Sequence, residues 1–180
     1  MNRIKYITSA SVLVLTILLG VLGIYFTLRD RKTHLTMDIA AESNVLDVLH
    51  PISDLSIQFL GRDIEKEKLN LKVLTVRIMN DGESNIHEDD FDSHMPFGLR
   101  VEGGTVVRAQ VASYNSSYLA ENLHPQLQAP DTVLFNKIIF DKHKFVAVEL
   151  LVLHNKDQQP QVKELGKIAG LEIISVTNSF

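Results

Sequence analysis

The stretch that decides the fold runs from Leu69 to Met79 and reads LNLKVLTVRIM. Its apolar residues alternate with polar ones, first at 69, 71 and 73 and then at 74, 76 and 78. A period of two is typical of a β-strand that buries one face. The slip of one position would swap the two faces, so we predict a β-bulge near Val73–Leu74. Asn80-Asp81-Gly82 follow directly and favour a tight turn.

Short alternating stretches recur on both sides of this strand. Glu102–Gly104 and Asp141–Lys144 each lie between two such stretches and predict two hairpins. Helical periodicity is confined to Ala41–Leu49 and Ser117–Leu123. Many short strands favour an all-β, antiparallel β-sandwich, and we expect the immunoglobulin-like, two-sheet form. The expected strands are 34–41, 55–59, 69–79, 97–101, 105–111, 133–140, 145–153 and 171–176.

An uncharged segment, Tyr6–Leu28, precedes the β-rich part. As a helix it would extend roughly 34 Å, enough to cross a hydrocarbon core of about 30 Å. A cleaved signal peptide is the alternative, but its apolar region is shorter, and the charged residues 29–32 stand where a cleavage site would lie. The sequence therefore predicts a single transmembrane anchor in residues 1–32 and a β-sandwich domain in residues 33–180.

The membrane orientation does not follow from the basic residues that flank this segment. Arg3 and Lys5 lie on one side, and Arg29, Arg31 and Lys32 lie on the other. The positive-inside rule compares these two groups and finds no clear asymmetry. The expected location is thus the cell membrane. The flanking charges do not decide on which side of the membrane the domain lies.

Small residues recur at helical spacing within the predicted anchor, at Thr16, Gly20, Gly23 and Thr27. A stripe of small residues lets two membrane helices approach closely, which predicts self-association or a partner helix. The alternative is that such residues are simply tolerated inside a membrane helix.

The composition excludes several classes of function. Residues 33–180 hold 13 Lys and Arg against 21 Asp and Glu, a net charge of −8, so a nucleic-acid partner is not expected. Cysteine is absent, which rules out disulfides and thiolate metal sites. Neither a Gly-x-Ser-x-Gly elbow nor a phosphate-binding loop occurs, so no cofactor and no catalytic residues are implied.

One dense polar cluster stands out between residues 87 and 94. Mixed carboxylate and imidazole ligands suit Zn²⁺ or Mn²⁺, and an oxygen-rich site suits Ca²⁺. The spacing matches neither an EF-hand loop nor a helical zinc site. The alternative is a solvated loop in which Phe91 points inward and an aspartate caps a backbone turn. The candidate metal ligands are His87, Glu88, Asp89, Asp90, Asp92 and His94.

The order of several segments resembles a group of uncharacterised prokaryotic membrane-anchored proteins. The resemblance rests on LTMDIAAESNVLDV, LSIQFLGRDIEK, LTVRIMNDGESNIHEDDFD, GLRVEGGTVVRAQV and GKIAGLEIISV, and it covers roughly Leu35–Val176. It implies a single β-sandwich behind a membrane helix, with a basic stretch after the helix that favours a cytoplasmic domain. It also implies a structural role in the turn for Asp90 or Asp92, and it implies no activity.

These observations favour a membrane-tethered, non-enzymatic binding or scaffold module. Its expected partners are the lipid bilayer and either a protein that contacts loops or a sheet edge, or a second copy. The alternative is a membrane-anchored, divalent-metal-binding sensor or hydrolase that uses the loop of residues 87–94.

Overall fold

The computed structural model describes residues 14–24, 33–46, 57–171 and 176–178. The chain divides into two compact units, Met1–Arg31 and Lys32–Phe180. In the first unit residues 14–24 form a helix whose side chains are all exposed. Within the described ranges, no helix combines the length and apolar character needed to cross a membrane. The remainder of the predicted anchor, Tyr6–Leu28, lies outside these ranges.

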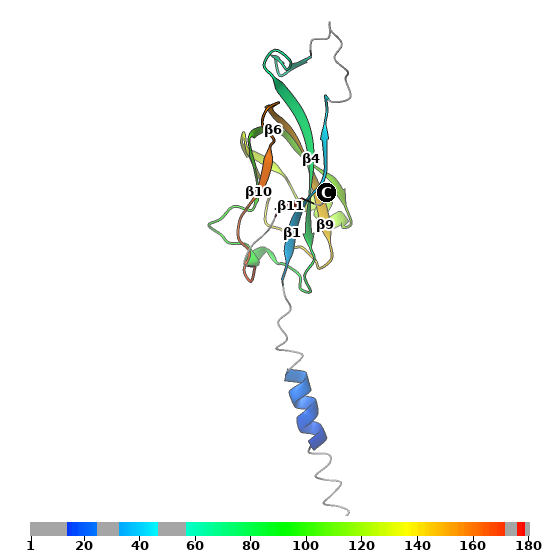
Figure 1. Ribbon diagram of the computed structural model, residues 1–180. Coiled ribbons are helices and arrows are strands. Elements are labelled where there is room, and N and C mark those ends of the chain that lie inside the picture. Colours follow the sequence, from blue (N-terminus) through cyan, green and yellow to red (C-terminus); the bar gives the residue numbers. More distant parts are fainter. Residues whose placement is uncertain (1–13, 25–32, 47–56, 172–175, 179–180) are drawn as a thin grey trace, which may run out of the picture. The chain divides into compact units, whose positions relative to one another are not determined.

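The second unit consists mainly of antiparallel strands, which confirms the predicted all-β class (Figure 1). A five-stranded sheet has the order β11-β1-β4-β9-β6, and a four-stranded sheet has the order β10-β5-β8-β7. The elements are β1 (Leu35–Asn44), β2 (Gln58–Phe59), β3 (Arg62–Asp63), β4 (Leu69–Asn80), the 3-10 turn η1 (Glu88–Asp90), β5 (Gly98–Glu102), β6 (Gly104–Tyr114), the helix α2 (Ser117–Asn122), β7 (Gln126–Ala129), β8 (Thr132–Leu134), β9 (Phe145–Asn155), β10 (Gln161–Leu165) and β11 (Val176–Asn178).

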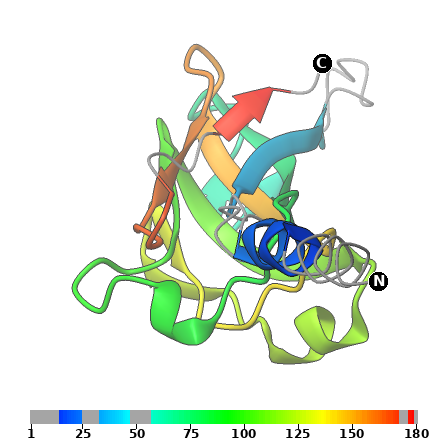
Figure 2. The ribbon, with the colours of Figure 1, turned by 90° about the horizontal axis from the view of Figure 1, so that it is seen from below.

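The five-stranded sheet is built around β4 and β9, which pair without interruption from Leu69↔Asn155 to Met79↔Phe145. β1 pairs antiparallel with β4, and β11 pairs parallel with β1, as the red and blue strands in Figure 2 illustrate. At the other edge the amide of Val106 in β6 donates to the carbonyl of Pro130, which follows β7. The two sheets therefore meet along the β6 edge.

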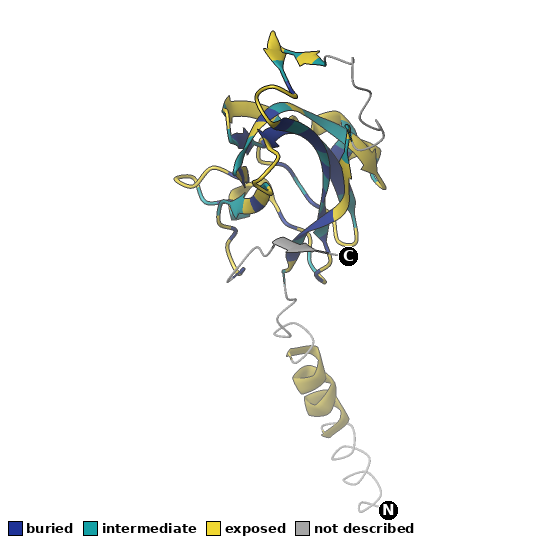
Figure 3. Ribbon diagram, turned by 45° about the horizontal axis from the view of Figure 1, so that its top comes forward, coloured by how far each residue is buried: buried dark blue, intermediate teal, exposed yellow. Residues whose placement is uncertain are grey.

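The main core fills the space between the two sheets, and Figure 3 shows that many residues of the curved strands are buried. Alternation along β4 and β9 supplies Leu74, Val76 and Ile78 from one strand and Val148 and Leu150 from the other. Three aromatic rings close one end of this core. Phe97 lies 4.9 Å from Phe91 and 5.4 Å from Phe135, measured between ring centroids.

The predicted bulge at Val73–Leu74 is wrong, because the pairing of β4 with β9 has no register shift there. The slip in the sequence has a different cause. Leu69 and Leu71 pack on one face of β4 against a small second cluster that includes Ile64 and Leu153, whereas later residues face the main core. The strand thus buries opposite faces at its two ends. The irregularities instead lie in β1 near Ala40 and at two places in β6.

Both predicted hairpins are also wrong. At Gly103, whose φ is +80°, the chain leaves β5 in the four-stranded sheet and enters β6 in the five-stranded sheet. β5 instead pairs with β10 and β8. Likewise, Asp141–Lys144 connect the segment after β8 to β9, which belongs to the other sheet. Each turn is real, but it carries the chain between sheets.

The two short helical predictions have different outcomes. Ser117–Leu123 is confirmed by α2. In Ala41–Leu49 the strand β1 instead continues to Asn44, and residues 47–49 lie outside the described ranges. Of the predicted last strand, 171–176, residues 172–175 lie outside the described ranges, Leu171 belongs to no strand, and Val176 begins β11 (Val176–Asn178).

Candidate functional site

The acidic loop of residues 87–94 connects β4 to β5 and is fixed to a second loop of the sandwich. The amide of Asp92 donates to the carbonyl of Lys167 at 2.9 Å, and the amide of Ala169 donates to the carbonyl of Asp90 at 2.7 Å. Phe91 lies between these two bonds, forms a β-bridge with Ile168 and is buried. The apolar Phe91 therefore anchors the loop while its charged neighbours remain at the surface.

Asp90 uses its carboxylate to fix the short turn η1. The amide of His87 donates to Asp90 Oδ2 at 2.7 Å, and the amide of Asp90 donates back to the carbonyl of His87 at 3.0 Å. This reciprocal pair satisfies polar backbone groups that a single turn leaves without partners. The turn explains why an aspartate stands three residues after His87.

Asp92 plays a similar part at the end of the loop. Its Oδ1 accepts a hydrogen bond of 2.7 Å from the amide of His94. This bond lowers the pKa of Asp92 below its ordinary value. Desolvation opposes the shift, and the nearby His94 and Lys167 add to it. The Asp92 carboxylate is therefore held in its ionised form as part of the turn.

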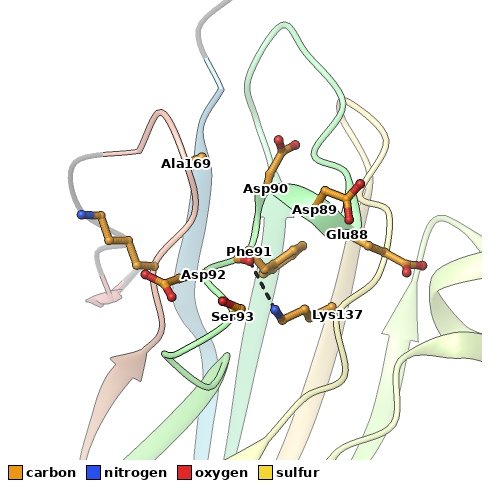
Figure 4. A pocket seen from close by; sticks show the side chains of 9 residues that line it. Glu88, Asp89, Asp90, Phe91, Asp92, Ser93, Lys137 and Ala169 are labelled. Atoms are coloured by element: carbon orange, nitrogen blue, oxygen red, sulfur yellow. Dashed lines mark hydrogen bonds between the residues drawn. The ribbon is translucent and has the colours of Figure 1, made fainter.

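A surface pocket lies against this loop, and Figure 4 shows its lining side chains. The carboxylates of Glu88, Asp90 and Asp92 point in different directions (Figure 4). Lys137 crosses below Phe91, and its Nζ donates to the Phe91 carbonyl at 3.3 Å. In the part of the chain that the structure describes, no three His, Asp or Glu side chains are grouped to hold a metal ion.

The other predicted site residues lie in the N-terminal unit. Thr16, Gly20 and Gly23 belong to the helix of residues 14–24 and are exposed. A Cβ added to either glycine would meet nothing within 4 Å, so both positions have room for a larger side chain or a neighbouring helix. Thr27 lies outside the described ranges.

A second polar cluster, which the sequence did not reveal, lies where β4 begins and β9 ends. Lys72 has a side chain only 6% exposed, and its Nζ lies 2.7 Å from Gln159 Oε1 and 3.4 Å from Glu42 Oε2. Lys72 shares a face of β4 with Leu74, so its position in the alternation was the available signal. A buried ammonium needs such partners.

His154 lies at the same end of the sandwich and is 4% exposed. Its Nδ1 is 2.8 Å from the carbonyls of both Asn155 and Gln158. Because both partners are acceptors, Nδ1 carries a proton. Nε2 is buried and has no hydrogen-bond partner. His154 and Lys72 thus both bind the connection between β9 and β10, which closes this end.

The chemistry of the two clusters is mainly structural. The carboxylates of Asp90 and Asp92 accept backbone amides within the acidic loop, and that of Glu88 points away from both (Figure 4). Comparison of the chain with protein-family models, with curated proteins and with solved structures finds no match.

Proposed function

We propose that the chain is a membrane-tethered, non-enzymatic binding module. The observation that carries this proposal is the uncharged segment Tyr6–Leu28 directly before an all-β unit that is compact by itself. A segment of this length and composition suits the hydrocarbon core. The two packed sheets suit an immunoglobulin-like sandwich that presents its loops or an edge to a protein partner.

The geometry of the acidic loop supports binding over metal chemistry. Asp90 and Asp92 each accept a backbone amide at 2.7 Å, so both carboxylates already stabilise the fold. A metal site would require these oxygens to converge on one point. The loop then presents a negatively charged surface, with Lys137 and Lys167 at its margin.

The tether is tested by comparing the full chain with a variant that begins at Thr33. We expect the full chain to remain in the membrane pellet after washing at alkaline pH, and the shorter chain to appear in the supernatant. Because only lipid-embedded proteins resist this wash, release of the full chain would overturn the proposed anchor.

The side of the membrane is tested by fusions at the C-terminus. Alkaline phosphatase is active outside the cytoplasm, and a fluorescent protein that matures only in the cytoplasm reports the opposite location. We propose the cytoplasmic side, on the basis of the resemblance to proteins with a basic stretch after the membrane helix, which Arg29, Arg31 and Lys32 match. Phosphatase activity without fluorescence would contradict it and would direct the search for a partner to the cell envelope.

Association through the anchor is tested separately, by a two-hybrid assay in membranes. If the small-residue stripe lets two helices approach, Gly20→Ile with Gly23→Ile removes the signal, because two β-branched side chains separate the backbones. Ala10→Ile with Val21→Ile provides a control of similar apolar character outside the stripe. A signal that survives the glycine substitutions would show that the stripe does not mediate association.

A further inference from the structure

We propose that the hairpin of residues 57–68 is a hinged strap that opens while the sandwich stays folded, and that opening exposes an apolar strip on the outer face of β4 and β9. The strip consists of Leu69, Leu71, Leu151 and Leu153. This inference does not depend on the proposed membrane tether, because it concerns only residues of the second unit.

The strands of the hairpin pair only with each other. β2 and β3 form a separate two-stranded sheet with the register Gln58↔Asp63 and Phe59↔Arg62. Within the described residues, neither strand extends the two larger sheets. An isolated two-stranded hairpin is only marginally stable in water, so contacts of its side chains with the sheet must hold it in place.

Few side chains of the hairpin contact the sheet. Of residues 57–68, all of which the structure describes, Ile64 alone is buried. Ile57 and Phe59 are only partly buried against the same cluster. The main core contains none of the buried residues of this cluster, so the two can separate without opening the sandwich. The ion pairs Arg62–Glu67 and Lys66–Asp63 join parts of the hairpin to each other.

The backbone of the hairpin is strained at both of its ends. The turn between β2 and β3 consists of Leu60 and Gly61, with φ of +52° and +77°. Lys68, where the hairpin joins β4, also has φ of +52°. Positive φ is unfavourable for residues with a Cβ. Leu60 is 73% exposed, so burial does not offset this strain.

The packing of the hairpin against the sheet also leaves a space. A surface pocket is lined by Arg62 of the hairpin together with Leu69 and Leu153 of the sheet. The amide of Lys156 donates to the carbonyl of Lys68 at 2.8 Å, which holds the hinge end rather than the tip. Few buried apolar contacts and many exposed backbone bonds are the features of segments that open locally.

Hydrogen exchange of the full chain in mild detergent tests the proposal. The reporters are the amides of Ile64 and Leu69, which donate to the carbonyls of Ile57 and Ile64, and the central amides of β9. We expect the hairpin amides to exchange at least about 100-fold faster than those of β9, in a concerted step. Equal protection of both sets would overturn the proposal, because the hairpin would then open only when the whole domain unfolds.

Two substitutions in the hairpin should move its exchange in opposite directions. Ile64→Ala removes the one buried side chain and should speed hairpin exchange at least about tenfold. Leu60→Asn should slow it, because asparagine tolerates positive φ in a two-residue turn of this kind. Both should leave the β9 amides unchanged.

Ile78→Ala in the main core is the matched control, since it should instead speed the β9 amides. If Ile64→Ala speeds β9 exchange as much as hairpin exchange, the strap is part of one cooperative unit and the proposal fails. The proposal also fails if Leu60→Asn leaves the exchange of the hairpin amides unaltered or makes it faster.

Discussion

Arg77 of β4 and Asp38 of β1 face each other across the sheet and form a bidentate pair. Arg77 Nε and Nη2 donate to Asp38 Oδ1 and Oδ2, both at 3.0 Å. Asp38 is buried, while the side chain of Arg77 is 42% exposed. A planar guanidinium matches a carboxylate in this geometry, so the pair both fixes the register and compensates a buried charge.

We therefore expect Arg77→Ala to destabilise the domain by about 2 kcal/mol, because it removes two charge-assisted hydrogen bonds from a buried carboxylate. Urea unfolding of the full chain in detergent measures this change. Arg108→Ala, at an exposed position of β6, is the control and should cost less than about 0.5 kcal/mol. A loss of equal size in both variants would show that the pair has no special role.

Much of the sheet could be predicted from alternation, and β4 shows where that reasoning reaches its limit. The alternation identified the strand and the position at which its buried face changes. It did not show whether the chain bulges or a second cluster covers the other face. The answer depends on Ile64 and Leu153, which are distant from the slip at Val73 and which only the folded structure brings beside it.

The connections between strands were less predictable for a related reason. Turn residues such as Gly103 show that the chain reverses direction, but they do not determine which strands then pair. β5 pairs with β10, whose Val162 lies opposite Val101. The packing of two sheets selects this pairing, and nothing in the local sequence around Gly103 reports it.

Part of the candidate site could be predicted from the sequence, and part of it could not. The aspartates of the acidic loop were evident from the sequence, and their role as caps was among the alternatives because aspartate often accepts a nearby backbone amide. The cluster at Lys72 and His154 was not foreseen. Its partners include side-chain and backbone atoms of Gln159 and Gln158, which come close only when the β9–β10 connection folds over this end.

Asn80 provides the second prediction. Its side chain is fully buried and donates to the carbonyls of Ser84 and Phe140, each at 2.8 Å, while Oδ1 accepts the amide of Gly82 at 3.1 Å. Asn80→Ala should cost about 3 kcal/mol, since it removes three hydrogen bonds made by a fully buried side chain. Thermal unfolding measures the change.

The control for this prediction is Asn85→Ala. Asn85 is exposed and accepts one amide, that of Lys142, at 3.0 Å, so loss of this bond should cost about 1 kcal/mol or less. If both variants lose the same stability, burial of the Asn80 network contributes little, and the turn after β4 is held by other contacts.

The third prediction concerns pH. Because the amide of His94 lowers the pKa of Asp92 in the folded state, ionised Asp92 stabilises the fold above the pKa of the unfolded chain. This contribution is lost as the pH falls through the pKa that Asp92 has in the folded state, which is the lower of the two. Asp92→Ala should therefore melt below the wild type at neutral pH, and the gap in Tm should narrow as the pH falls below the ordinary pKa of an aspartate.

Asp92→Asn separates the charge from the hydrogen bond, since its side-chain oxygen can still accept the amide of His94. At neutral pH its Tm should lie between those of the wild type and Asp92→Ala. A gap in Tm between the wild type and Asp92→Ala that stays constant across the pH range would contradict the electrostatic explanation. A gap that widens in acid would show that ionisation of Asp92 destabilises the fold.

The last prediction is that Ca²⁺, Zn²⁺ and Mn²⁺ do not bind the acidic loop. A site occupied at 100 times its Kd would stabilise the fold by about 2.7 kcal/mol, which is several degrees in Tm. We expect no such shift at about 1 mM metal, because Asp90 and Asp92 are each bound to a backbone amide. A metal could take them only by breaking those bonds. A saturable rise in Tm that Asp90→Asn abolishes would contradict this prediction, because it would show that the loop rearranges to bring its carboxylates together.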